Sequence, residues 1–380
     1  MFKDDLAVFS NDYFEARAKF REAAGRAGAT LTQYSNPQRG PMGRELTTDV
    51  AHWGAADAQK ILMLICGSHG VEGLPGSACF LDWLQRSTFR HLPADVAAIL
   101  VHGINPFGMA WRQRQTEDNI DLNRNFVDFE HRDYPSGAIY DEVHDTLVGA
   151  APETPAWRDA DHFLANVKLK YGRDRLYTEI MGGQHRHPDG LFFSGAGPTW
   201  SQSTIRRILT EHCLSARSMG IVDFHTGLGP YGYGMLGCAD NAGSGGLQRA
   251  REWFGAQTVV RIRRLIDDQD SATLSKAPMG DMGGGIQQAV PNASVTYVAL
   301  EVGTYEVGRF LDAYRANCWM QKHGSRESVI GERIAGDFES VFYPRFDDWK
   351  EMLLARARQV TRQALFGLGR AHSNPGGAKE

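Results

Sequence analysis

Short runs of apolar residues that stop abruptly at polar ones constrain the fold of this chain most strongly. A run of this kind, without alternation, is typical of a strand buried on both faces of a parallel sheet. The runs are Ile61–Cys66, Val96–Val101, Gly220–Phe224 and Ser294–Leu300. Segments with helical periodicity lie between and around them, at residues 11–27, Gly76–Arg86, Ser203–Met219 and Asp347–Leu365. The alternation predicts an α/β fold in which a mixed, largely parallel sheet is flanked by helices.

We interpret the 380 residues as one domain, because no repeat and no Pro- or Ser-rich linker divides them. We expect this single domain to cover residues 1–370, followed by a flexible C-terminal tail over residues 371–380. A chain of this size buries about three-quarters of its unfolded surface, so it needs neither disulfides nor a metal ion for stability. The five cysteines are scattered and form no C-x-x-C pair, which is typical of the reduced thiols of a cytosolic protein.

The charge balance and the N-terminus exclude several classes of protein. The 41 Lys+Arg and 45 Asp+Glu leave a net charge of −4, whereas a general nucleic-acid binder has a basic excess. The apolar runs are far shorter than the ~20 residues that cross a bilayer. The first residues, MFKDDLAVFSNDYF, carry acids where a signal peptide has a basic region and an apolar core. We therefore expect a soluble, cytoplasmic protein with no nucleic-acid or membrane partner.

Metal-binding or acid/base side chains follow three of the predicted strands. His69 and Glu72 come after the first strand, His225 directly follows the third, and Glu301 directly follows the fourth. Glycines are concentrated in the same segments, GSHGVEGLPG and HTGLGPYGYGMLG, where they let the backbone turn or approach a ligand. Ligands of open α/β sheets bind beyond the carboxyl ends of the strands. We therefore expect these side chains to meet at one edge of the sheet.

The residues that we expect to meet form a set suited to zinc. His69 and Glu72 reach one ion only where the backbone turns sharply, which the glycines around them permit. By itself, an H-x-x-E pair is more often a helix cap or a surface pair. A second imidazole, from His225, completes a set of two histidines and one glutamate, which holds zinc tetrahedrally and leaves one position open. This arrangement is that of a catalytic rather than a structural site.

Several motifs together resemble a known family. The segments GSHGVEGLPGSA, EDNIDLNRNF, VDFHTGLGPYG and ALEVGTYE are similar to the DUF2817 family of zinc-carboxypeptidase-like proteins. That family is related to the M14 metallocarboxypeptidases and, more distantly, to succinylglutamate desuccinylase and aspartoacylase. The resemblance extends from about Phe14 to Phe366. It implies a zinc-carboxypeptidase-like (phosphorylase/hydrolase-like) architecture and one Zn²⁺ held by His69, Glu72 and His225.

The same resemblance implies a catalytic base. Glu301 would take a proton from the attacking water and pass it to the leaving amine. A carboxylate that follows an apolar strand is partly desolvated, which suits this role. Two alternatives stay open: Glu301 forms a strand-end ion pair, or Glu306 acts in its place.

Two arginine segments are implied to bind the substrate. By resemblance, Arg114 in WRQRQTEDN polarises the scissile carbonyl and holds the developing oxyanion, with Arg112 as the alternative for this role. Asn123 and Arg124 in DLNRNF resemble the segment that grips the terminal carboxylate of a substrate, and a planar guanidinium suits that task. The alternative is a structural loop in which the arginine pairs with Asp121.

Other candidate positions leave more than one interpretation. Asp223 either orients the imidazole of His225 or is a buried cap. Tyr305 is the tyrosine that we expect to contact the substrate, with Tyr231 and Tyr233 as alternatives and a structural role open for all three.

Three further segments suggest sites that we interpret as structural. His185 and His187 resemble a metal pair, but next to Pro188 their spacing favours a polar loop. His102 ends a strand without a carboxylate partner in HGINPFG and is interpreted as a packing residue. Met279–Gly285 lacks the G-K-[ST] of a phosphate-binding loop and is interpreted as a mobile loop near the site.

These observations predict a zinc-dependent hydrolase of amide bonds, carboxypeptidase-like, that acts on a small-molecule or peptide substrate with a carboxylate. An N-acyl amino acid deacylase with the same residues is the alternative enzyme. The alternative that is not an enzyme is a non-catalytic, metal-binding relative. Such a protein would be free to lose at least one of the three ligands or the base, but His69, Glu72, His225 and Glu301 are all present. The sequence leaves the natural substrate and the oligomeric state open.

Overall fold

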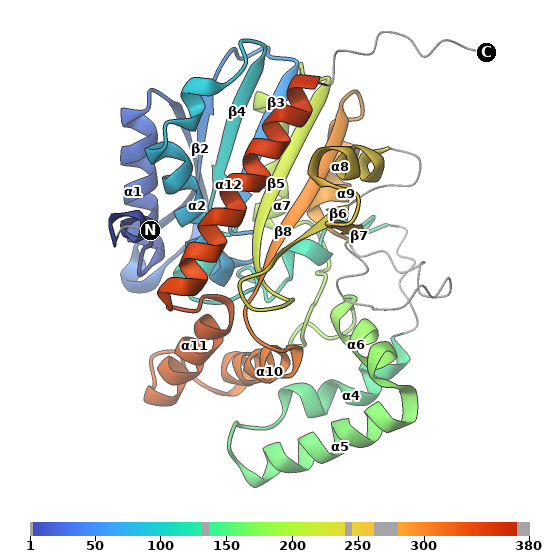
Figure 1. The fold of residues 1–380 in the computed structure, drawn as a ribbon. Helices are drawn as coiled ribbons and strands as arrows, with labels where there is room; N and C mark the ends of the chain where they lie inside the picture. Colours follow the sequence, from blue (N-terminus) through green and yellow to red (C-terminus); the bar gives the residue numbers. More distant parts are fainter. Residues whose placement is uncertain (1–2, 131–136, 240–244, 262–279, 371–380) are drawn as a thin grey trace, which may run out of the picture.

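An eight-stranded sheet runs through the protein, in the order β1-β2-β4-β3-β5-β8-β6-β7 (Figure 1). The computed structural model describes residues 3–130, 137–239, 245–261 and 280–370, so the predicted tail over 371–380 lies outside the described residues. The strands are β1 Thr30–Arg39, β2 Glu45–Trp53, β3 Lys60–Cys66, β4 Val96–His102, β5 Ser218–Gly227, β6 Gly234–Ala239, β7 Val259–Arg261 and β8 Ser294–Gly303.

The central strands of the sheet are parallel. Strand β3 pairs in parallel with β4 and β5, and β5 pairs in parallel with β8. The pairs β1 with β2, β2 with β4 and β6 with β8 are antiparallel, whereas β6 and β7 are parallel. The sheet is thus mixed and largely parallel, as the apolar runs of the sequence predicted.

Helices cover both faces of the sheet. The helices are α1 Tyr13–Arg26, α2 Gly73–Gln85, α3 Pro106–Ala110, α4 Ala138–Val148, α5 Pro155–Tyr171, α6 Arg173–Met181, α7 Trp200–His212, α8 Gly246–Phe254, α9 Met282–Ala289, α10 Val307–His323, α11 Val329–Phe342 and α12 Asp347–Arg370. On β3, Leu62 and Leu64 face a core shared with α1, α2, α8 and α12, whereas Ile61 and Met63 face a core shared with α7 and α9. Because both faces are buried, this strand reads as a continuous apolar run.

A third core lies beyond the carboxyl ends of the central strands. It joins α4, α5, α6, α10 and α11, which lie together below the sheet in Figure 1. Val71, Phe192 and Phe342 belong to this core. Since Val71 is the neighbour of Glu72, these helices pack against the edge of the sheet at which the candidate residues lie.

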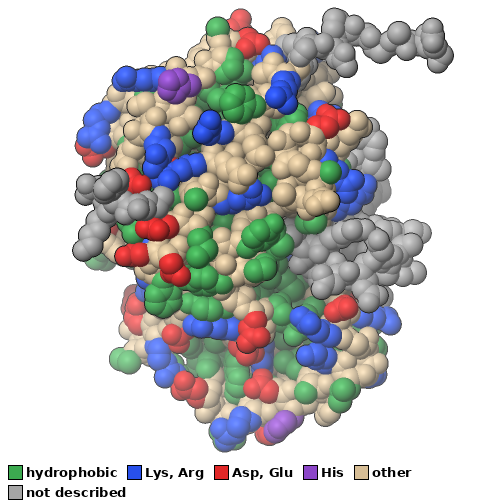
Figure 2. Space-filling view, in the orientation of Figure 1, with side chains coloured by type: hydrophobic (Ala, Val, Ile, Leu, Met, Phe, Trp, Pro, Cys, Tyr) green, Lys and Arg blue, Asp and Glu red, His purple; other side chains and the backbone are tan. Residues whose placement is uncertain are grey.

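Polar and charged side chains occur on the described helices and on the face shown in Figure 2. Among the described helices, none is long and apolar enough to cross a membrane. Acidic and basic side chains are interspersed on the face shown in Figure 2. This face therefore lacks a large surface of one sign of charge.

Several predicted boundaries differ from the structure. The helix predicted over Ser203–Met219 ends at His212, and Ser218 already belongs to β5. Strands β5 and β8 continue two residues beyond His225 and Glu301, because the parallel pairing between them extends to Gly227 and Gly303. His225 and Glu301 therefore lie inside their strands, near the carboxyl ends, rather than after them.

The predicted mobile loop over Met279–Gly285 is wrong from Met282 onward. Met279 lies outside the described residues, and α9 begins at Met282 with Asp281 as its N-cap. A Cβ atom on Gly285 would lie 2.1 Å from the Phe126 ring. The glycine-rich sequence therefore serves close packing of a helix.

Candidate metal centre

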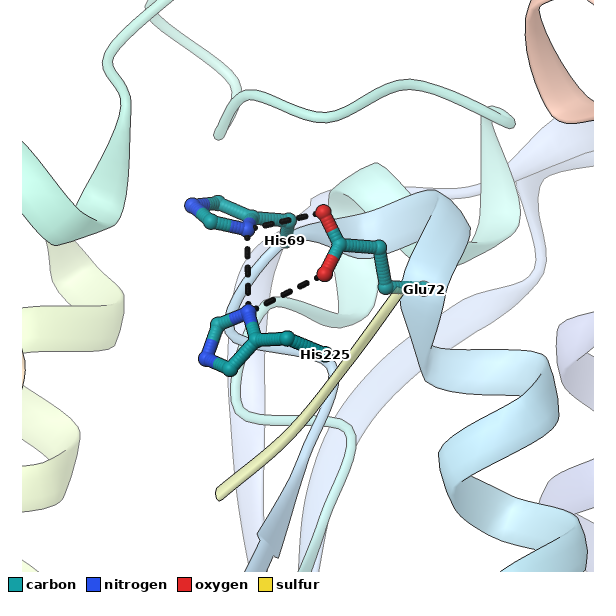
Figure 3. A group of neighbouring side chains, drawn as sticks. All are labelled: His69, Glu72 and His225. Atoms are coloured by element: carbon teal, nitrogen blue, oxygen red, sulfur yellow. Dashed lines mark hydrogen bonds and ion pairs between the residues drawn. The ribbon is translucent and has the colours of Figure 1, made fainter. Parts of the chain in front are cut away.

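His69, Glu72 and His225 lie together, with one possible ligand atom of each within 4.8 Å of those of the others (Figure 3). Nδ1 of His69 is 2.9 Å from Oε1 of Glu72, and Nδ1 of His225 is 3.0 Å from Oε2. The two Nδ1 atoms are 3.3 Å apart. All three side chains are buried. The chain thus brings together the three residues that the sequence singled out as metal ligands.

Tight backbone contacts hold His69 and Glu72 in this position. The chain leaves β3 through Gly67, whose φ of 79° is in the left-handed region that favours glycine. The short 3-10 turn Gly70–Glu72 then leads directly into α2. A Cβ atom on Gly70 would lie 2.0 Å from the carbonyl carbon of Gly108, so only glycine fits there.

An aspartate holds the far nitrogen of each imidazole. Nε2 of His69 is 3.2 Å from Oδ1 of Asp121, and Nε2 of His225 is 2.8 Å from Oδ2 of Asp223. A carboxylate only accepts hydrogen bonds, so Nε2 of each ring carries the proton. Both Nδ1 atoms consequently face Glu72, the direction in which a metal ion would use them.

The dimensions of this group suit a tetrahedral zinc ion. With zinc–nitrogen bonds of about 2.0–2.1 Å, neighbouring ligand atoms of a tetrahedron are about 3.3 Å apart. The recorded separations between the nitrogen and oxygen atoms are 2.9, 3.0 and 3.3 Å. The lone pairs of two neutral imidazole nitrogens and the oxygens of a carboxylate repel each other unless protons or a cation lie between them. The donor set therefore fits a divalent ion with three protein ligands.

The charges of the centre depend on the same contacts. Burial alone would raise the pKa of the Glu72 carboxyl, but its contacts with His69 and His225 outweigh burial and lower it. Burial opposes the charge on His225, but Asp223 and Glu72 raise its pKa well above the usual value. Glu72 is therefore an anion at neutral pH, as a metal ligand must be.

Glu301 lies next to His225 across the β5–β8 ladder, where the two are register partners. Oε1 of Glu301 accepts a hydrogen bond from the backbone N–H of Leu228 at 2.9 Å. Burial, and after it the charge of Glu72, raise the pKa of Glu301 to about 7. A half-buried carboxyl group with this pKa can gain and lose a proton near neutral pH.

The structure separates the two arginines that the sequence left as alternatives. Arg114 is buried; its Nη1 donates to Oε1 of Glu72 at 2.9 Å and its Nε to Oδ2 of Asp121 at 3.0 Å. Arg112 is directed to α11, where its Nε donates to Glu339 at 2.5 Å. Only Arg114 thus contacts the candidate ligands.

Asn123 and Arg124 are buried, and their side chains form hydrogen bonds with backbone groups of the protein. The Asn123 Oδ1 atom accepts from the backbone N–H of Met282 at 3.0 Å. Nε and Nη2 of Arg124 donate to the carbonyl oxygen of Met181 at 3.0 and 2.5 Å, and Nη1 donates to that of Asn123 at 2.8 Å. Burial lowers the pKa of Arg124, and the nearby charge of Arg114 lowers it further. Asp121 bonds to Arg114 rather than Arg124, which differs from the sequence-based alternative.

The three tyrosines considered as substrate contacts, Tyr305, Tyr231 and Tyr233, differ in burial and in their partners. The half-buried ring of Tyr305 is covered by the guanidinium of Arg309, 3.9 Å from the ring centroid. Tyr231 donates to Asp348 at 3.2 Å, and Tyr233 is exposed. Within the described part of the chain, Tyr305 makes no hydrogen bond to the three candidate ligands.

His187 and His102 make hydrogen bonds and ring contacts with residues other than the candidate ligands. Nε2 of His187 is 2.9 Å from Asp141, and its ring stacks on His144 at 3.9 Å. His102 is fully buried, bonded to Ser77 at 2.9 Å and stacked on Phe20. These contacts agree with the polar-loop role expected for His187 and with the packing role expected for His102.

Sequence reasoning did not identify Ser68 and Tyr297, both of which contact Asp223. Ser68 Oγ is 2.9 Å from both carboxylate oxygens of Asp223, and Tyr297 Oη is 2.7 Å from Oδ2. Strand periodicity places Asp223 and His225 on the same face of β5. Ser68 and Tyr297 come from other segments, and only the register of the sheet shows that they meet.

Several solved structures are similar to this chain over most of its length. A carboxypeptidase A from Helicoverpa armigera is 15% identical over 86% of this chain and 73% of that chain, with a TM-score of 0.41. Bovine thrombin-activatable fibrinolysis inhibitor, solved with tick carboxypeptidase inhibitor, is 13% identical over 94% and 97%, with a TM-score of 0.46. The succinylglutamate desuccinylase from Chromobacterium violaceum is 13% identical over 87% and 80%, with a TM-score of 0.37.

The family is shown by the sequence itself. No curated protein matches the chain. Residues 9–356 match the family described as a protein of unknown function, DUF2817. The match covers most of the 380 residues and contains each of the candidate site residues. The chain therefore belongs to the DUF2817 family, as its motifs predicted.

Proposed function

We propose that this chain is a zinc-dependent hydrolase of amide bonds, carboxypeptidase-like, with one Zn²⁺ bound by His69, Glu72 and His225. The observation that carries the proposal is the convergence of two Nδ1 atoms on the two oxygens of one carboxylate. A bound zinc ion supplies a Lewis acid and lowers the pKa of a water molecule that it binds to about 7. The remaining steps are assigned to side chains of the chain itself.

Glu301 is the proposed general base. Its Oε1 atom is held by the N–H of Leu228, which fixes the carboxylate beside His225. With a pKa of about 7, the group can accept a proton from the attacking water and return it to the leaving amine at neutral pH. A carboxylate at its ordinary, lower pKa would be a weaker base and would accept that proton less readily.

Arg114 is the proposed residue for the developing oxyanion. A guanidinium has five N–H groups, and the two bonds of Arg114 to Glu72 and Asp121 leave three for other acceptors. Its two carboxylate partners fix it next to the centre, so its remaining donors are in place before charge develops on the substrate.

Asn123 and Arg124 are the proposed partners of a substrate carboxylate. Three of the five N–H groups of Arg124 are bonded to backbone oxygens, which leaves two, and the side-chain amide N–H₂ of Asn123 is not used by its contact with Met282. The structure supports a fixed orientation of Arg124 rather than a mobile one. Tyr305 stays a predicted substrate contact.

The test combines metal content with a panel of amide substrates. The purified protein is assayed on blocked dipeptides, on unblocked dipeptides and on N-acyl amino acids, before and after chelation and with zinc restored. We expect one zinc per chain, hydrolysis that chelation abolishes, and a preference for substrates with a free carboxylate. Preference for N-acyl amino acids over blocked dipeptides would favour the deacylase.

Glu301→Gln separates catalysis from metal binding. This variant should keep its zinc and lose about 10²- to 10⁴-fold in turnover, the usual contribution of a general base. Glu306→Gln, at an exposed carboxylate five residues later, is the matched control and should turn over like the wild type. Stoichiometric zinc without hydrolysis of any amide would show a binding protein instead.

A further inference from the structure

A buried carboxylate behind the metal centre receives four hydrogen-bond contacts from three side chains. Ser68 Oγ lies 2.9 Å from both oxygens of Asp223, Tyr297 Oη lies 2.7 Å from Oδ2, and Nε2 of His225 lies 2.8 Å from the same oxygen. All four residues are buried. A carboxylate has no proton to donate, so both hydroxyls and the imidazole must donate to it.

Three adjacent strands build this arrangement. Asp223 is the register partner of Ile65 on β3 and of Ala299 on β8. Tyr297 lies two residues before Ala299 and therefore on the same face of β8, while Ser68 follows β3 by two residues. The parallel register thus brings Ser68 and Tyr297 to Asp223 from either side.

Among the described residues, Asp223 differs from the other buried aspartates because it has no arginine as an ion-pair partner. Each of the others is paired with one or two arginines: Asp49 with Arg17 and Arg21, Asp82 with Arg86 and Arg358, and Asp121 with Arg114. Within the part of the chain that the structure describes, Asp223 has an ion pair with His225 and with no other side chain. An uncompensated buried carboxylate is costly, so a cation bound to Nδ1 of His225 would supply positive charge close to Asp223.

We propose that Ser68, Asp223 and Tyr297 form a positioning group that sets how tightly the centre binds its metal ion through His225. This rests on the proposed function, because it assigns His225 as a ligand. The two hydroxyls donate to Asp223 and fix its orientation, and Asp223 accepts the Nε2–H of His225, which keeps that proton on Nε2. Nδ1 then faces Glu72 and His69 with its lone pair, and the carboxylate makes that nitrogen a stronger donor to a cation.

The test measures zinc affinity by competition with a chromophoric chelator. Asp223→Asn should weaken zinc binding about 10- to 100-fold, the usual cost of losing the carboxylate behind a ligating histidine. Tyr297→Phe, which removes one hydrogen bond to Asp223, should weaken it about fivefold. Both variants should also change the visible spectrum of the cobalt-substituted protein, since the His225 nitrogen is a weaker ligand in each.

Tyr140→Phe is the matched control. Tyr140 is as buried as Tyr297, and its Oη donates to the carbonyl oxygen of Leu191 at 2.8 Å, so its removal costs one buried hydrogen bond away from the centre. The thermal unfolding of the metal-free Tyr140→Phe and Tyr297→Phe variants should shift alike, while only Tyr297→Phe loses zinc affinity.

The outcomes separate this inference from the proposed function. Wild-type protein that binds zinc tightly, with Asp223→Asn and Tyr297→Phe within twofold of it, overturns the positioning group and leaves the hydrolase standing. Should Asp223→Asn fail to fold, Tyr297→Phe against Tyr140→Phe decides alone. Wild-type protein without affinity for zinc overturns both.

Discussion

Replacing Gly70 by alanine should disable the metal centre through a clash that can be read from the structure. An added Cβ atom would lie 2.0 Å from the carbonyl carbon of Gly108, 2.3 Å from its Cα and 2.4 Å from the carbonyl oxygen of Gln113. These are all backbone atoms, which have no rotamer by which to yield. To restore an ordinary contact of about 3.4 Å, the two segments must separate by about 1.4 Å.

That movement is large for a metal site. Gly70 and Val71 donate their N–H groups to the carbonyl oxygens of Arg114 and Gln113, so a shift displaces Glu72 and Arg114 relative to each other. Metal–ligand distances are tolerated within about 0.2 Å, and misplacement of about 1 Å commonly costs 10²-fold in rate. We expect Gly70→Ala to lose at least about 10²-fold in zinc affinity, and about 1–3 kcal/mol in the free energy of unfolding from overpacking.

The assay is zinc competition together with denaturant unfolding of the metal-free protein. Gly197→Ala is the control, because a Cβ atom there meets nothing within 4 Å and the backbone is not left-handed. Gly197→Ala should match the wild type in both measurements. If Gly70→Ala binds zinc within threefold of the wild type, the reasoning about the turn before Glu72 is wrong.

Three further predictions concern single side chains. In a pH–rate profile, the rate should fall about tenfold per pH unit on the acid side, because the base Glu301 must be deprotonated. The pKa of Glu301 is about 7 and a nearby cation lowers it, so this fall should begin at or below pH 7. The remaining activity of Glu301→Gln should not show this fall. Arg114→Lys should lower kcat/KM by more than tenfold, whereas Arg112→Lys, at the ion pair with Glu339, should leave it within twofold in steady-state assays. Burial lowers the pKa of His102 from 6.5 to about 4. The free energy of unfolding should therefore lose nothing from His102 above pH 6.5 and fall by about 3 kcal/mol as the pH drops to 4. Urea unfolding of His102→Gln should show a smaller loss over this pH range.

The fold could be predicted where burial leaves a simple pattern. Strand β3 was expected over Ile61–Cys66 and occupies Lys60–Cys66, because both of its faces are covered and nearly every residue is apolar. Strand β1, TLTQYSNPQR, is mostly exposed or half-buried at the sheet edge and has no such run. Among the helices of the third core, α5 gave no clear signal, since only Ala160 and Val167 of its 17 residues are buried.

The clustering of the candidate metal ligands could be predicted because each lies at or near the carboxyl end of a central strand. The chemistry of His69, Glu72 and His225 is visible in their side chains, and a parallel sheet brings such positions to one edge. Ser68 and Tyr297 are ordinary residues whose role depends on strand register. The contact between Arg124 and the carbonyl oxygen of Met181 joins residues 57 apart in sequence, and neither has a pattern that indicates it.

The most direct test of the account is the zinc stoichiometry and affinity of three proteins measured side by side. The wild type should bind one zinc ion per chain, and His225→Ala should bind it at least about 10³-fold more weakly while remaining folded. His187→Ala, which removes an imidazole that pairs with Asp141 instead, should bind zinc like the wild type. A wild type that takes up no zinc, or a His225→Ala variant that binds it equally tightly, would contradict the proposed centre.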